Sequence, residues 1–255
     1  MDKKSNILLT NDDGFNAEGL KKIYEILQDQ YQITIVAPAQ EQSGSGLSIT
    51  FKDPIRYHEV TWENGIHAWG VYGTPADCVN LAFKVILDSK PVLVISGINN
   101  GSNAGRSVLY SGTLGAAIES VMQGVPSIAF SYADSKHSDH YDTYISLIVD
   151  YFIKNLPPKG TCINVNIPSS PIKGCRMTQQ GKGLWTDDLK IESHVEKGFV
   201  ANLINGRFIH INEDSESDVV LLSKGYITAT PIDIFDLTNF EHISKHQKKF
   251  EEILI

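Results

Sequence analysis

The stretch Ile7-Leu8-Leu9-Thr10-Asn11-Asp12-Asp13-Gly14 decides the fold of this 255-residue chain. Its first half is a short apolar run typical of a buried strand, and it stops at two adjacent carboxylates and a glycine. A helical pattern over Ala17–Leu27 and a second apolar run over Ile33–Ala37, ended by Pro38, follow it. Strand, helix and strand in this order form one βαβ unit, which indicates a parallel sheet.

Outward from this unit, apolar runs and helical patterns continue to alternate as far as residue 130. Two shorter, partly polar strands, Leu47–Val60 and His67–Val71, favour an antiparallel excursion before the alternation resumes. The sequence therefore predicts an α/β fold, a mostly parallel sheet with helices on both faces. The remaining expected elements are a helix capped by Thr74 and running to Leu87, a strand over Pro91–Ile95, a helix over Thr113–Gln123 closed by Gly124, and a strand over Val125–Phe130.

Beyond Ser131 the pattern changes, and a break at Leu156–Gly160 follows a further helix. We place a domain boundary there: residues 1–155 form the larger α/β domain, and residues 156–255 form a smaller β-rich lobe. The lobe contains a hairpin over Gly198–Ile211 folded about Asn205-Gly206. It ends in a helix over Asn239–Ile255 whose broken apolar stripe indicates docking, and we expect this lobe to serve oligomerisation.

Composition limits the classes of function. A hydrophobic content of 42% supports a large core, and a formal net charge of −8 argues against binding a nucleic acid polymer. Three widely spaced cysteines without a CxxC pair suggest neither a disulfide framework nor a zinc site. No run of about 18 apolar residues occurs, and the N-terminal apolar run is too short for a signal-peptide core. We expect a soluble, cytoplasmic protein with no membrane partner.

The adjacent Asp12 and Asp13 concentrate negative charge. At an effective dielectric near 20, two carboxylates about 4 Å apart repel by roughly 4 kcal/mol, and no Lys or Arg lies between Lys4 and Lys21. A hard divalent ion such as Mg²⁺ or Mn²⁺ prefers oxygen ligands and would turn the repulsion into a binding site. The alternative interpretation is that Asp13-Gly14 marks a turn after the strand.

Two more polar loops follow predicted strands, over residues 39–46 and 96–105. Loops at the carboxyl ends of parallel strands face one crevice, so these two and the Asp12-Asp13 loop are expected to converge. Ser43 and Asn99 can each offer one neutral oxygen there. Taken singly, the two loops also fit a flexible linker and a run of turns; three such loops together favour a ligand site.

Tyr110-Ser111-Gly112-Thr113 lies directly before a predicted helix. A helix N-terminus offers free backbone N–H groups and about half a positive charge, so it binds phosphate without a lysine. Ser111 or Thr113 also suits the role of helix cap, and the two roles are compatible. Phosphate binding at this helix is therefore consistent with an acidic chain.

These segments, in this order, resemble the survival protein E (SurE) family of metal-dependent nucleotidases, strongly to about residue 130 and by layout beyond it. The resemblance implies a Rossmann-like domain and a cytoplasmic 5'-nucleotidase that releases phosphate from nucleoside monophosphates. It also implies oligomers with exchanged C-terminal segments, here a homodimer or homotetramer. By the resemblance the metal ligands are Asp12, Asp13, Ser43 and Asn99, and the phosphate contacts are Asn103, Ser111, Gly112 and Thr113, to which we add Asn11.

The expected reaction is hydrolysis of a nucleoside 5'-monophosphate, with one divalent ion per subunit, Mg²⁺ or Mn²⁺, and with Asp12 and Asp13 as catalytic residues. Phosphoryl transfer needs mainly positioning and charge neutralisation, which such a site supplies. Attack by water and attack by an aspartate both stay open. Cleavage of 3'-monophosphates and of short polyphosphate also stays open.

Other classes fit less well. A dinucleotide-dependent oxidoreductase needs G-x-G-x-x-G after the first strand, where this chain has Asn11-Asp12-Asp13-Gly14. A non-catalytic nucleotide-binding or metal-binding module shares the fold and is not excluded. Several further residues have functional and structural interpretations, and for each we favour the structural one: His137, His140, His242 and His246 as surface residues, Arg106 as an exposed loop residue, and Trp69, Tyr72 and Trp185 as packing residues.

Overall fold

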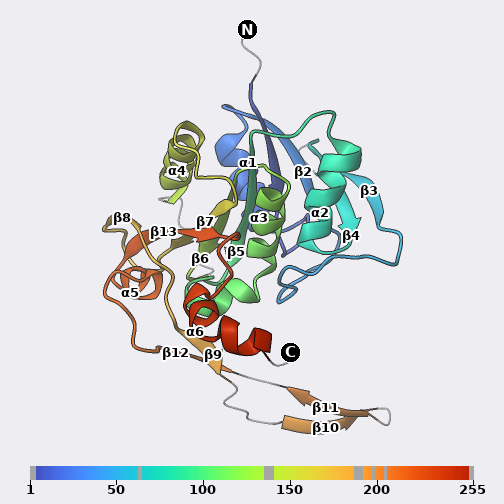
Figure 1. Cartoon of the computed structure of the whole chain (residues 1–255). Helices are drawn as coiled ribbons and strands as arrows, with labels where there is room; N and C mark the ends of the chain where they lie inside the picture. The colour runs from blue at the N-terminus through green and yellow to red at the C-terminus, as the bar shows by residue number, and fades with distance from the viewer. Residues whose placement is uncertain are drawn as a thin grey trace.

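The computed structural model describes residues 4–62, 65–134, 141–186, 192–196, 199–203 and 206–252 (Figure 1). Its elements are, in chain order, β1 (Asn6–Thr10), α1 (Glu18–Leu27), β2 (Gln32–Pro38), β3 (Arg56–Thr61), β4 (His67–Tyr72), α2 (Pro75–Leu81), the π-helical turn η1 (Ala82–Ile86), β5 (Leu93–Asn100), the 3₁₀ turn η2 (Gly105–Leu109), α3 (Gly112–Met122), β6 (Ser127–Tyr132), α4 (Asp142–Lys154), β7 (Thr161–Ile167), β8 (Gly174–Met177), β9 (Leu184–Thr186), β10 (Glu192–Glu196), β11 (Phe199–Leu203), β12 (Arg207–Ile209), α5 (Asp218–Ser223), β13 (Tyr226–Asp233) and α6 (Phe240–Glu251).

A nine-stranded sheet in the order β3-β4-β2-β1-β5-β6-β7-β13-β8 organises the fold. The six strands from β4 to β7 run parallel to their neighbours, whereas β3 and β13 are antiparallel to β4 and β7. From β1 the chain first builds outward through β2, then crosses back to place β5 on the other side of β1. In open α/β sheets such a reversal opens a crevice at the carboxyl ends of the two central strands.

Helices cover both faces of this sheet (Figure 1). Ile7 and Leu9 of β1 pack with α1 and α4, whereas Leu8 between them packs with α2 and α3. Successive strand residues point to opposite faces, so a continuous apolar run such as β1 can bury both. The predicted fold class, mostly parallel with helices on both faces, is thus confirmed.

Three strands from beyond residue 156 belong to the main sheet, which corrects the predicted boundary. β7 pairs with β6, β13 pairs with β7, and β8 pairs with β13. The Leu156–Gly160 break connects α4 to β7, and Gly160 adopts a φ of 83° there. Proline and glycine mark a turn equally well inside a domain and between domains, so the break misled the prediction.

The predicted hairpin about Asn205-Gly206 is also wrong. β11 pairs with β10, and β12 pairs with β9, so the four strands form two separate two-stranded sheets, which together we call the arm (Figure 1). A Cβ on Gly206 would lie 2.6 Å from the Thr186 carbonyl oxygen. Close approach of the two arm strands therefore explains this glycine, although Asn-Gly is also a turn signal. Asn205 itself lies outside the described residues.

Local sequence signals predicted most of the other helix and strand ends to within a few residues. Thr74 caps α2 in a capping box with Asp77, as its sequence predicted. The expected strand Leu47–Val60 is shorter than predicted, because only Arg56–Thr61 pairs with β4. Among the described residues, none of the helices has both the length and the apolar character needed to cross a membrane.

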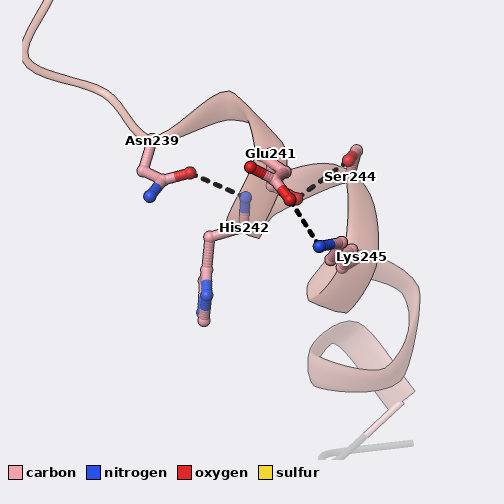
Figure 2. Close-up of polar contacts among 5 residues, drawn as sticks. All are labelled: Asn239, Glu241, His242, Ser244 and Lys245. Carbon is pink, nitrogen blue, oxygen red and sulfur yellow. Dashed lines mark hydrogen bonds and ion pairs between the residues drawn. The ribbon is translucent and has the colours of Figure 1, made fainter.

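The C-terminal helix α6 has no buried residue among those described, and Figure 2 shows the polar contacts near its start. The Asn239 side chain accepts a hydrogen bond from the His242 N–H at 2.9 Å, and Lys245 pairs with Glu241 at 2.5 Å. These local contacts cap the helix and stabilise its polar side. Phe240 and Phe250, its largest apolar residues, are 68% and 74% exposed.

Candidate functional site

Polar loops at the carboxyl ends of β1, β2 and β5 meet in one cavity of about 250 Å³. These loops carry most of the predicted site, and α3 begins at the same cavity. Five of the predicted residues line it: Asp12, Ser43, Asn99, Asn103 and Ser111. The other four, Asn11, Asp13, Gly112 and Thr113, surround this group through contacts described below.

The first loop is held by Asn11, which is fully buried. Its Nδ2 donates to the Gly14 carbonyl at 2.9 Å, and its Oδ1 accepts the Gly14 N–H at 3.2 Å. Both polar atoms of the side chain are therefore occupied by the turn. The side chain thus holds the aspartate loop in place, and the role of Asn11 as a phosphate contact stays a prediction.

Asp12 is 3% exposed and lies against the start of α3. The Thr113 hydroxyl donates to Asp12 Oδ1 at 2.7 Å. A Cβ on Gly112 would lie 2.8 Å from the Asp12 Cβ, so only glycine permits this approach. Burial raises the pKa of Asp12, although the Thr113 hydrogen bond opposes the shift. Thr113 and Gly112 thus orient the carboxylate.

Asp13, the second carboxylate of this loop, is partly buried and has a raised pKa. Burial, together with the charges of Asp12 and Glu41, raises the pKa of Asp13 to about 6. The Asn100 backbone N–H opposes this shift by donating to the carboxylate. Carboxylates gathered in this way favour a cation between them, because a cation removes both the repulsion and the cost of burial.

The second loop is fastened to the first and to α3. The Gln42 N–H donates to the Asp12 carbonyl at 2.7 Å, and the Ser43 hydroxyl donates to Glu41 Oε1 at 2.6 Å. A Cβ on Gly115 would lie 2.1 Å from the Gly46 carbonyl oxygen. Gly115 therefore lets the loop that carries Ser43 pack directly on α3, a role that its sequence did not reveal.

The predicted loop over residues 96–105 begins inside β5, which continues to Asn100 and carries a bulge between Ser96 and Asn99, where the Gly97–Ile98 peptide is cis. Asn99 Nδ2 donates to the Gly101 carbonyl at 2.6 Å, so Oδ1 is the atom that Asn99 can offer to a ligand. The bulge interrupts the regular pairing and re-aims the following side chains toward the cavity.

Asn103 is held by residues of β6 and β7 that the sequence interpretation missed. Its N–H donates to Asn166 Oδ1 at 2.7 Å, its carbonyl accepts from Asn164 Nδ2 at 2.9 Å, and its own Nδ2 donates to Ser131 Oγ at 2.9 Å. Asn164, Asn166 and Ser131 are fully buried. The alternation Cys162-Ile163-Asn164-Val165-Asn166-Ile167 was the available signal, because it places both amides on one face of a buried strand.

The donor set suits a hard divalent ion. Among the described residues, no three His, Cys, Asp or Glu side chains gather closely enough to hold a metal. Two carboxylates with hydroxyl and amide oxygens instead match an ion that accepts neutral oxygens and keeps some water. Ser45 Oγ, next to Gly112, is buried without a hydrogen-bond partner among the described residues, as expected where a polar ligand belongs.

Apart from Trp185, the remaining candidates do not line this cavity or lie outside the described residues. Arg106 points its guanidinium to Gln180 Oε1 at 3.3 Å, and the imidazoles of His242 and His246 lie 4.6 Å apart on α6. His137 and His140 are not among the described residues. Trp185, expected to be a packing residue, instead lines the cavity and is 56% exposed.

Fold and site together define a class: a doubly wound α/β protein with an acidic, oxygen-rich ligand site at the reversal of strand order. A family model described as "Survival protein SurE" matches residues 7–187. The 5'-nucleotidase SurE of Protochlamydia amoebophila is 43% identical over 98% of both chains, and that of Thermoanaerobacter sp. strain X514 is 39% identical over 93% of this chain and 95% of its own. The crystal structure of the SurE protein from Aquifex aeolicus superposes with a TM-score of 0.80 at 33% identity, covering 96% of this chain and 99% of that one. The chain belongs to the survival protein SurE family, as the resemblance implied.

Proposed function

We propose that this chain is a metal-dependent 5'-nucleotidase, a hydrolase that releases phosphate from nucleoside monophosphates. One observation carries the proposal: Asp12, Ser43, Asn99 and Asn103, from three separate loops, line one cavity at the start of α3. The relatives at 43% and 39% identity bear the name 5'-nucleotidase SurE, which supports the same reaction here.

We assign the site residues to two roles, metal binding and phosphate contact. Asp12, Asp13, Ser43 and Asn99 would hold the ion, and the ion when bound neutralises the carboxylates and polarises the phosphate. Asn103 and Ser111 would contact the phosphate, and the start of α3 at Gly112 and Thr113 lies close by. Asp12 and Asp13 are the proposed catalytic residues, and a cation between them would favour their charged forms. Water and aspartate as attacking groups both stay open.

The defining test is phosphate release from a panel of nucleoside monophosphates with Mg²⁺, Mn²⁺ or EDTA, for the native protein and Asp13→Asn. We expect release that requires metal and is lost in the variant. Glu59→Gln is the matched control, because Glu59 of β3 is an exposed carboxylate that pairs with His67 of β4. No release with any metal from a protein that still binds nucleotide would favour a regulatory module. Oxygen-18 transfer in a single turnover then distinguishes attack by water from attack by aspartate.

The finer properties of the metal are also a proposal. We expect one ion per subunit, Mg²⁺ or Mn²⁺, because the ligand set contains two carboxylates and only neutral oxygens besides. Calorimetric titration with MnCl₂ and MgCl₂ measures both the stoichiometry and the affinity. A ratio of two ions per chain, or tighter binding of Zn²⁺ through nitrogen or sulfur ligands, would contradict it.

We also propose that the chain assembles into a homodimer or homotetramer in which C-terminal segments are exchanged. Phe235, Leu237, Phe240 and Phe250 of this segment are between 68% and 85% exposed. So many exposed large apolar residues in one segment are typical of an interface. Sedimentation of the native chain and of a form truncated before Asn239 tests this, and an unchanged mass would contradict it.

A further inference from the structure

A second cavity, of about 540 Å³, adjoins the first. Gly101, Ser102, Ser107 and Trp185 line both cavities, so the two are neighbours with a common wall. The smaller cavity is the polar one that holds the aspartates. The larger one has a volume in the range of small-molecule sites and is lined mainly by apolar groups.

Aromatic and hydroxyl side chains both line the second cavity. The aromatic rings come from the arm: Trp185 on β9 and Phe208 on β12, directly opposite each other in the pairing, contact edge to face with centroids 6.1 Å apart. Ser169, Ser170 and Ser223 contribute the hydroxyls. Aromatic rings together with hydrogen-bonding groups in one cavity are the combination that accommodates a heterocyclic base with its sugar.

Hydrogen bonds join the segment just before Trp185 to the segment just after Asn103, and these bonds define the position of Trp185 relative to Asn103. The Arg106 N–H donates to the Gly183 carbonyl at 2.8 Å. Asp218 is fully buried, and its carboxylate accepts the N–H groups of Gly105 at 3.1 Å and Gly181 at 2.7 Å. One buried carboxylate therefore joins the segment after Asn103 to the segment before Trp185.

We propose that the second cavity is the nucleoside subsite of this protein, with the base stacked on the indole of Trp185. The proposal rests on the proposed nucleotidase function and specifies which part of the substrate each cavity accepts. Phosphate enters the polar cavity, and the nucleoside extends past Gly101 and Ser102 toward the arm. Because every base has a π-face, stacking on Trp185 tolerates different bases.

Steady-state kinetics with two substrates test the proposal. Trp185→Ala should raise KM for AMP about tenfold, as expected for loss of one base–aromatic stack, and leave KM for glycerol 2-phosphate unchanged. Trp185→Phe should restore most of the affinity for AMP. Tyr57→Ala removes an aromatic residue of similar exposure on β3 and should change neither KM. Equal effects of Trp185→Ala on both substrates, or none on AMP, would overturn the subsite.

A binding measurement separates this proposal from the catalytic one. Adenosine carries no phosphate, and it should quench tryptophan fluorescence in the native protein but not in Trp185→Phe, where the buried Trp62 and half-buried Trp69 remain. Quenching that persists in Trp185→Phe would overturn the subsite even if AMP is hydrolysed. If no nucleotide is hydrolysed but quenching behaves as expected, the subsite stands and the nucleotidase proposal fails.

Discussion

At the scale of single residues, glycines decide how closely the site can be assembled. Gly115 and Gly112 face the Ser43 loop and Asp12, and a methyl group at either position would overlap these neighbours. Within a helix, alanine is ordinarily the better residue by about 1 kcal/mol. Glycine at these two positions therefore reflects the requirement of the site, not of the helix.

Gly115→Ala should lower kcat/KM by about 10- to 100-fold, because the added Cβ displaces the Gly46 carbonyl and with it the loop that carries Ser43. Met122→Ala, at an exposed position of the same helix, is the control. Activity within twofold of the native value in Gly115→Ala would show that the loop can move without loss of the site.

Asp13→Asn should stabilise the metal-free protein while removing its response to metal. The pKa of Asp13 is raised to about 6 in the fold, so its charge opposes folding above that pH and is neutral, without cost, below about 3.8. Allowing for solvent screening, we expect a gain of about 1 kcal/mol at pH 7 and less at pH 4.5.

Urea unfolding in EDTA at both pH values measures this gain, and Glu59→Gln serves again as the exposed control. A metal-free Asp13→Asn protein that is less stable than the native one at pH 7 would contradict the charge-repulsion account. The metal response is read separately, as the rise in Tm on adding MnCl₂ to each protein.

At the scale of elements, β7 contributes to the site without lining its cavity. Asn166→Leu removes the acceptor of the Asn103 N–H, and an unpaired buried donor costs about 1–3 kcal/mol. We expect weaker inhibition by inorganic phosphate, by about tenfold, with Mn²⁺ affinity unchanged. Thr228→Val is the matched control, because Thr228 pairs with Asn166 across the sheet and its buried hydroxyl lacks a partner among the described residues. Equal loss of phosphate and metal affinity would argue for general unfolding instead.

The elements that the sequence predicted well are those defined by local signals. The Thr74 capping box fixes the start of α2, and the apolar run before Asp12 fixes β1. Pairing of distant strands has no local signal, which is why the partners of β11 and the place of β7 were missed. The same holds for the site: the loops carrying Asp12, Ser43 and Asn99 follow predictable strands, whereas the support of Asn103 comes from about 60 residues away in sequence.

At the scale of the whole molecule, the nine-stranded sheet makes one cooperative unit of segments that were predicted to be separate. Ile227 of β13 is buried in the same core as Ile7 and Leu9 of β1. Residues in one core unfold together unless an interface divides it.

Ile227→Ala should therefore shift a single unfolding transition, at a cost of about 2–5 kcal/mol for a large-to-small change in a core. Calorimetry on the native chain, on Ile227→Ala and on Met177→Ala, whose side chain is exposed on β8, makes the comparison. Two transitions, of which only one responds to Ile227→Ala, would restore the two-domain division.

The dependence of Asn103 on β7 also bears on when activity arises during synthesis. When residues 1–155 of the nascent chain have left the ribosome, neither asparagine of β7 has yet emerged. The proposed ligands are already present at that point: Asp12, Asp13, Ser43, Asn99 and Asn103. The backbone of Asn103 then lacks both of its amide partners, Asn164 and Asn166. A nascent chain of this protein consequently holds every proposed ligand before it can hold substrate, and it reaches competence only when the strand containing Asn164 and Asn166 has emerged and joined the sheet.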